Sequence, residues 1–129
     1  FYHVWGPQWR YVKQSDGSPR LNSNWMGIAG AGQLMLGNTT PETQRVELRL
    51  TAISPGAGCR LTIAGPDGVP LLKDVAVSGG PGTLEVPAFQ LSPGEQPLSF
   101  QVRGSSYLNP AELYVNVVEI RRAPEATPQ

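Results

Sequence analysis

Aromatic and polar side chains gather near the start of the chain. The rings Trp5, Trp9, Tyr11 and Trp25 are interleaved there with Arg10, Asn22 and Asn24. Indole and phenol rings stack on the apolar C–H faces of sugars, while guanidinium and amide groups hydrogen-bond to hydroxyls. Such rings also dominate the packing of protein cores. The cluster therefore predicts either a carbohydrate-binding surface or part of the core, and the alternation from Trp9 to Tyr11 places at least one ring near solvent.

Catalytic residues are scarce in the sequence. The single histidine is His3, and no G-x-S-x-G motif presents a serine nucleophile. The acidic residues are scattered singly, so a hydrolase would need a carboxylate such as Asp16 or Glu47 to meet a second carboxylate in a concave face. The sequence favours a protein that is not an enzyme, and we expect no catalytic residues.

Metal and cofactor sites have little support. The one cysteine, Cys59, shares the apolar phase of its segment and is expected to be a buried thiol, so we expect no transition metal and no cofactor. Calcium needs only oxygen ligands, and Asp16, Asp67 and Asp74 lie in or near turns, which leaves a structural calcium open. The glycines from Gly27 to Gly32 precede no helix pattern, so they predict a flexible or bulged connection and no phosphate site.

Charge and hydropathy argue against two classes of binding partner, nucleic acid and membrane. Ten basic and ten acidic residues give no net charge, so nothing in the composition indicates nucleic acid binding. The apolar runs are too short to cross a bilayer, and no direct membrane insertion is expected. Because the chain begins at Phe1, we expect it to be part of a longer protein.

The elements that position these residues are predicted to be strands, because apolar residues recur with period two between Gly- and Pro-rich turns. The N-terminal third offers three less regular strand candidates, at 9–13, 21–26 and 32–37. The phase shift at Val118 predicts either a bulge or a strand that is buried on both faces. The core strands are expected to be Val46–Ala52, Leu61–Ile63, Leu84–Val86, Leu98–Val102 and Leu113–Ile120.

This pattern of strands and turns predicts an all-β antiparallel sandwich, jelly-roll-like, of about nine strands, with an immunoglobulin-like sandwich as the alternative. Residues 1–122 are expected to form one domain, and 123–129 a flexible tail.

A family resemblance rests on the aromatic opening Phe1-Tyr2, the pairs Trp9-Arg10 and Trp25-Met26, and the segments 34–38 and 91–98. In these features the chain resembles the soluble β-sandwich domains that follow the membrane spans of bacterial multi-span membrane glycosyltransferases. Those domains are similar in outline to jelly-roll carbohydrate-binding modules. The resemblance implies an extracytoplasmic, non-catalytic accessory domain that contacts glycan. The alternative is a structural or protein-interaction domain that packs against the rest of a membrane protein or a partner subunit and has no ligand of its own.

Overall fold

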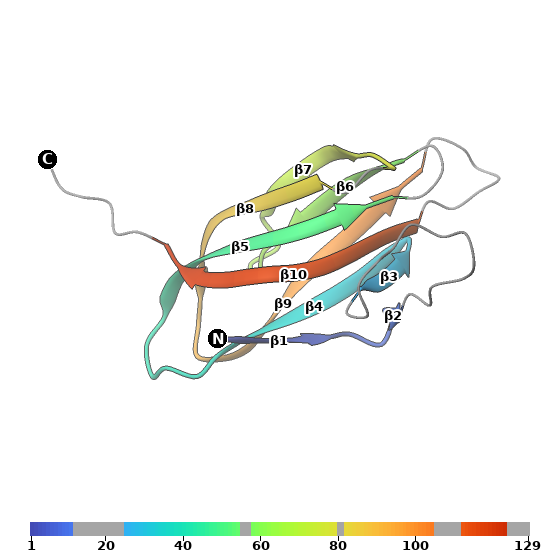
Figure 1. The fold of residues 1–129 in the computed structure, drawn as a ribbon. Coiled ribbons are helices and arrows are strands. Elements are labelled where there is room, and N and C mark those ends of the chain that lie inside the picture. The colour runs from blue at the N-terminus through green and yellow to red at the C-terminus, as the bar shows by residue number, and fades with distance from the viewer. Residues whose placement is uncertain (12–24, 55–57, 80–81, 105–111, 124–129) are drawn as a thin grey trace, which may run out of the picture.

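The computed structural model describes residues 1–11, 25–54, 58–79, 82–104 and 112–123 (Figure 1). Every regular element within these residues is a strand, and none is a helix long and apolar enough to cross a membrane. The ten strands are β1 Tyr2–Trp5, β2 Arg10–Tyr11, β3 Met26–Ala29, β4 Ala31–Asn38, β5 Gln44–Ile53, β6 Cys59–Ala64, β7 Pro70–Val77, β8 Gly82–Leu91, β9 Gly94–Arg103 and β10 Glu112–Arg122.

The strands form two antiparallel sheets that pack face to face. The first sheet has the order β1-β4-β9-β6-β7, and the second has the order β2-β3-β10-β5-β8. The chain changes sheet repeatedly as it proceeds, which is the jelly-roll pattern. The all-β antiparallel sandwich is confirmed, with ten described strands where about nine were predicted. The strands absent from the prediction are β1 and β7.

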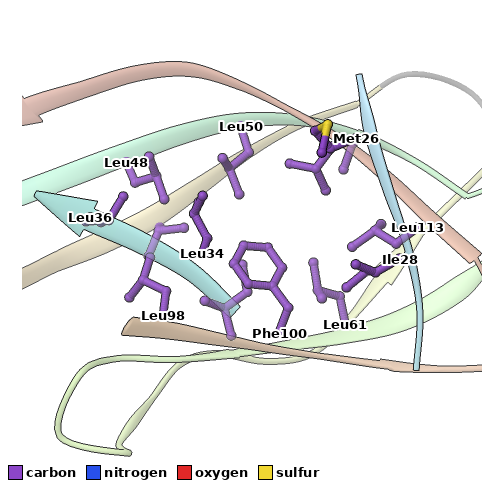
Figure 2. Packing of buried hydrophobic residues seen from close by; sticks show 14 of the residues in the cluster. Met26, Ile28, Leu34, Leu36, Leu48, Leu50, Leu61, Leu98, Phe100 and Leu113 are labelled. Atoms are coloured by element: carbon purple, nitrogen blue, oxygen red, sulfur yellow. The ribbon is translucent and has the colours of Figure 1, made fainter. Parts of the chain in front are cut away.

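The core fills the space between the sheets. Alternate residues of β5 are buried at Val46, Leu48, Leu50 and Ala52, as the sequence pattern predicted. The thiol of Cys59 is buried too, and burial raises its pKa. Leucines and isoleucines from both sheets surround Phe100, which is fully buried (Figure 2). Because the inward positions are taken by apolar side chains, the outward positions of both sheets remain for function.

Two bulges border β5 on either side. The ladder between β5 and β10 shifts register between Val117 and Glu119, which confirms the bulge predicted at Val118. The ladder between β5 and β8 shifts beside Glu47, where Pro87 is the outward-facing residue of the bulged strand. Bulges bend the strand that carries them and increase its twist. The outer face of the second sheet is therefore bent along both flanks of its β5 strand.

The glycine-rich segment from Gly27 to Gly32, which was predicted to be a flexible or bulged connection, is instead mostly strand. It consists of the end of β3 and the start of β4, separated by Gly30 alone, which has a φ of 83°. This left-handed conformation suits glycine and turns the chain from the second sheet into the first. The nitrogen of Val102 donates to the Gly30 oxygen at 2.6 Å. β3 has only four residues and is buried at three successive positions, so it shows no alternation, whereas the first six residues of β4 do alternate.

Asn38 is a buried polar side chain that joins the two sheets at one end. Its Nδ2 donates to the carbonyl oxygens of Glu42 and Leu91, each at 2.9 Å, and its Oδ1 accepts from Thr40. Asn38 ends β4 in the first sheet, whereas Leu91 ends β8 in the second. All its hydrogen-bonding groups are therefore engaged, and its side chain crosses from one layer to the other.

We expect Asn38→Ala to lower the free energy of unfolding by about 2–3 kcal/mol, because it leaves the buried carbonyl of Leu91 without its donor. Urea denaturation followed by tryptophan fluorescence measures the change. Thr39→Ala, at the exposed neighbouring position, is the matched control and should stay within about 0.5 kcal/mol of the parent. A loss at Asn38 no larger than that of the control would contradict this account.

Candidate functional site

The indole of Trp9 belongs to the core. It is 6% exposed and lies between Trp5 and Phe100, with ring centroids 4.6 Å and 5.3 Å away. Its Nε1 donates to the carbonyl of Gln33 at 3.0 Å, so its polar atom is satisfied inside the protein. Trp5 is only partly buried and covers Trp9 from the outside. Of this pair, only Trp5 offers surface to a ligand.

Trp25 lies in a second, smaller apolar cluster. It is 6% exposed and packs with Ile53, while Tyr114 is partly buried against them. Ile53 and Tyr114 are register partners in β5 and β10. They fall outside the main core, so this cluster occupies one end of the outer face of the second sheet. The Trp25 ring supports that end and has almost no open face.

Arg10 and Tyr114 meet on one carboxylate at the same end of the sheet. Arg10 Nη2 donates to Oε1 of Glu112 at 2.8 Å, and the Tyr114 hydroxyl donates to Oε2 at 2.9 Å. Burial, followed by this bond to Glu112, raises the pKa of Tyr114. The Arg10 side chain is 63% exposed. The sequence analysis missed Glu112 and Tyr114 as partners of Arg10; the only signal was the alternation that turned Tyr114 outward.

The remaining sequence candidates are only partly visible. The backbone of Tyr11 in β2 pairs with that of Met26 in β3, but the structure does not describe the Tyr11 side chain. Asn22 and Asn24 lie outside the described residues. The structure therefore brings Arg10 and Trp25 to one end of the second sheet, and places Trp5 and Trp9 at the edge of the core.

The outer face of the second sheet is organised in rows that cross its strands. The ladders of β2, β3, β10, β5 and β8 place four rows in register: Arg10, Gly27, Tyr114 and Ile53; then Asn116, Thr51 and Thr83; then Glu119, Arg49 and Glu85; then Arg121 and Glu47. Residues two apart on a strand are about 7 Å apart, so the four rows extend over about 20 Å. The face passes from aromatic to amide and hydroxyl groups and then to charges.

The charged end of this face is hollowed over the two bulges. The hollow has a volume of about 220 Å³ and is lined by Glu47, Arg49, Glu85, Pro87, Glu119 and Arg121, with Leu48 and Val86 beneath. Arg121 pairs with Glu47 at 3.0 Å and Arg49 with Glu85 at 3.4 Å. These side chains are partly exposed, and exposed pairs contribute at most about 1 kcal/mol each. A bound molecule with hydroxyl groups can therefore replace such contacts at little cost.

The hollow does bring Glu47 into one concave face with two further carboxylates, Glu85 and Glu119, as the hydrolase alternative required. Glu47 is bound to Arg121 within the hollow, and Asp16 lies outside the described residues. His3 is exposed by its surface area and makes an edge contact with Trp5 at 5.5 Å, and partial desolvation by its neighbours lowers the pKa of its imidazole.

Calcium donors are not assembled in the described part of the chain. No group of three or more His, Cys, Asp or Glu there could hold a metal ion. The carboxylate of Asp74 is bound by Arg60 and Arg103. The hydrogen bond from Arg60 makes the largest contribution to the lowered pKa of this carboxylate. Oδ1 of Asp67 accepts from the nitrogen of Val69. Neither carboxylate therefore belongs to a described group of donors that could hold calcium.

No protein-family model matches the chain, and no curated protein is significantly similar to it in sequence. Solved structures do share its fold. A family two carbohydrate esterase from Clostridium thermocellum in complex with cellohexaose is 16% identical over 98% of this chain and 34% of its own, with a TM-score of 0.52. A Podospora anserina GH26-CBM35 β-(1,4)-mannanase is 10% identical over 96% of this chain and 27% of its own, with a TM-score of 0.54. The chain thus spans about a third or less of these two proteins.

A third structure matches along its whole length. It is the carbohydrate-binding module CBM36 in complex with calcium and xylotriose, 13% identical over 94% of this chain and 100% of its own, with a TM-score of 0.51. The chain therefore has the β-sandwich fold of carbohydrate-binding modules, as the resemblance to such modules implied. The attachment to a membrane glycosyltransferase stays a prediction.

We expect that EDTA leaves the thermal midpoint of this protein unchanged, because Asp74 is already neutralised by two guanidinium groups. A calcium ion bound to the folded state would instead raise the midpoint with calcium concentration. Differential scanning calorimetry in EDTA and over a CaCl₂ series separates the two cases. A rising midpoint would contradict the expectation and would point to donors outside the described residues, such as Asp16.

Proposed function

We propose that the chain is a non-catalytic, extracytoplasmic accessory module that binds an oligosaccharide across the outer face of the second sheet. The observation that carries the proposal is the series of four rows on this face, which leads from Tyr114 to the hollow over the bulges. The fold class supports it, because the CBM36 structure of the same fold was determined with xylotriose. Extracytoplasmic placement follows from the resemblance to domains appended to membrane proteins.

Each row offers a different contact to a sugar chain. At one end, Tyr114 offers a partly exposed ring and Arg10 an exposed guanidinium. Asn116 and Thr51 add an amide and a hydroxyl in the next row. In the hollow, the guanidiniums can donate to sugar hydroxyls and the carboxylates can accept from them. A face of about 20 Å suits several linked sugars rather than one.

The charges of the hollow favour a neutral glycan. Three carboxylates face two guanidiniums there, so the local balance is negative. A sulfated or uronic polysaccharide would add negative charges opposite these carboxylates, and like charges repel. Hydroxyl groups meet no such penalty.

The N-terminal candidates take different roles in this proposal. Arg10 contacts the ligand from the edge of the second sheet. Tyr11, Asn22 and Asn24 stay ligand contacts proposed from the sequence alone. Trp25 supports the face from below. Trp5 and Trp9 hold the N-terminal segment in place.

A second candidate is a structural domain that packs against the rest of a membrane glycosyltransferase or a partner subunit. The observation in its favour is the exposed apolar edge formed by Phe1, Tyr2 and Val4, which are 38%, 41% and 45% exposed. Self-association without any response to sugar would favour it over the carbohydrate proposal.

We expect Arg10→Ala to weaken binding of a neutral oligosaccharide about tenfold, because it removes a charged donor from the first row. Isothermal titration with cellohexaose, xylotriose and a mannan oligosaccharide measures this after the best binder has been found. Asn116→Ala should have a smaller effect of the same sign, since its amide is neutral.

Arg103→Ala is the matched control, because Arg103 is 75% exposed, makes one ion pair and lies on the first sheet. It should bind like the parent. If ¹⁵N spectra of the parent show no shift in the second sheet at saturating concentrations of every neutral oligosaccharide, the proposed site is wrong.

A further inference from the structure

The ring of Tyr2 lies flat on the outer face of the first sheet. Tyr2, Gly37 and Glu95 are register partners on β1, β4 and β9. A Cβ added to Gly37 would collide with three ring atoms of Tyr2, so the phenol ring occupies the space above the glycine. The hydroxyl donates to Oε2 of Glu95 at 3.0 Å. The ring is thus fixed at its hydroxyl and on one face, and its other face is open.

The neighbouring row extends this ring into a small apolar surface. Val4, Met35 and Pro97 are register partners one row further along the same three strands. Tyr2 is 41% and Val4 45% exposed, while Met35 and Pro97 are partly buried. Gln33 and Ser99 form the next row and are polar. The apolar surface therefore consists of the Tyr2 ring and the row next to it. Glu95 offers hydrogen-bonding groups on one side, and Gln33 and Ser99 on the other.

We propose that Tyr2 forms, with Val4, Met35 and Pro97, a second carbohydrate site, on which the C–H face of a neutral sugar ring stacks. This site lies on the opposite sheet from the one proposed above and shares no residue with it. It rests on the same ligand class but not on the same surface, so either site can exist without the other.

The fixed position of the Tyr2 ring favours a small, flat ligand. A ring that is already ordered loses little conformational entropy when a ligand stacks on it. Within the described residues, Oε1 of Glu95 has no partner and can accept a hydrogen bond from a sugar hydroxyl at the edge of the ring. The bond to Glu95 raises the pKa of Tyr2, so the phenol remains a donor over the neutral range.

The size of the surface disfavours a protein as its occupant. A stable protein interface buries about 800 Å² on each partner. Two exposed side chains and two half-buried ones from a single end of the sheet fall well short of that area. A single sugar ring matches the width of two rows, which are about 7 Å apart.

Two sites on opposite sheets would have a consequence that one site does not. The outer faces of a sandwich point away from each other across its two layers. One domain could then hold two glycan chains at once, and its attachment to a polysaccharide surface would gain from multivalency.

The experiment uses the only two methionines of the chain as reporters. In protein labelled with ¹³C-methyl methionine, Met35 reports on the proposed surface, whereas Met26, which is 6% exposed, reports on the core. Titration with cellohexaose and xylotriose, with any affinity tag at the C-terminus, should move the Met35 methyl signal and leave Met26 nearly unchanged. The side-chain amide of Asn116 reports on the second sheet in the same sample.

Three variants test the role of the ring. Tyr2→Ala should lower the sugar affinity measured from the Met35 titration about tenfold, which is the scale expected for one stacked aromatic ring. Tyr2→Phe should lower this affinity less. Gly37→Ala keeps the ring but displaces it, so it should act like Tyr2→Ala, with the Met26 signal showing that the core is intact. Val69→Ala, at a 56% exposed valine in the turn before β7, is the control and should change nothing.

The outcomes separate the two sites. If Asn116 shifts at saturating sugar while Met35 does not, this second site is wrong and the first one stands. If Met35 alone shifts and Tyr2→Ala abolishes the shift, the second site stands and the location proposed above is wrong. If the Met35 signal depends on protein concentration and not on sugar, the surface is a protein contact, and the inference is overturned.

Discussion

A single backbone carbonyl, that of Gln33, fixes the place where the N-terminal segment leaves one sheet and enters the other. It accepts hydrogen bonds from the nitrogen of Gly6 at 2.9 Å and from Nε1 of Trp9 at 3.0 Å. A Cβ at Gly6 would lie 2.6 Å from this oxygen, so only glycine allows so close a crossing. Between these bonds the chain passes from β1 to β2. Tyr2 on the first sheet and Arg10 on the second, eight positions apart, therefore face opposite sides of the sandwich.

Strands with one buried face could be predicted from the sequence because burial imposes period two on them. This holds for β5 and β9, whose apolar positions were assigned correctly. It fails for β7, where two register shifts against β6 and the φ of 53° at Asp74 break the alternation. It fails for β1 as well, because that strand is exposed along nearly its whole length. An exposed edge strand carries no apolar period to detect.

The roles of the rings could not be predicted, because exposure depends on contacts far away in the sequence. Trp9 is buried because Phe100 and the carbonyl of Gln33 lie beside it. Tyr2, which was not among the predicted ligand-binding residues, is held in the open because Gly37 makes room for its ring. The rows on the outer faces likewise depend on strand register, which alternation alone leaves undetermined. Local patterns thus identified the strands, whereas long-range pairing decides which side chains can meet a ligand.

The two sheets handle their surface charges differently, and this difference bears on where ligands can bind. In the first sheet, register places Arg60 directly opposite Arg103, and like charges in that position repel. Asp74 adopts a left-handed backbone conformation, and its carboxylate lies between the two guanidiniums, at 3.2 Å from Arg60 and 2.8 Å from Arg103. Arg60 also donates to the Asp74 carbonyl at 2.7 Å, so this group is tied to the backbone. In the second sheet, by contrast, Glu119 reaches its two arginines only at 3.9 Å. These long contacts leave the carboxylate of Glu119 able to accept from a ligand, although Glu47 in the same hollow is held by Arg121 at 3.0 Å.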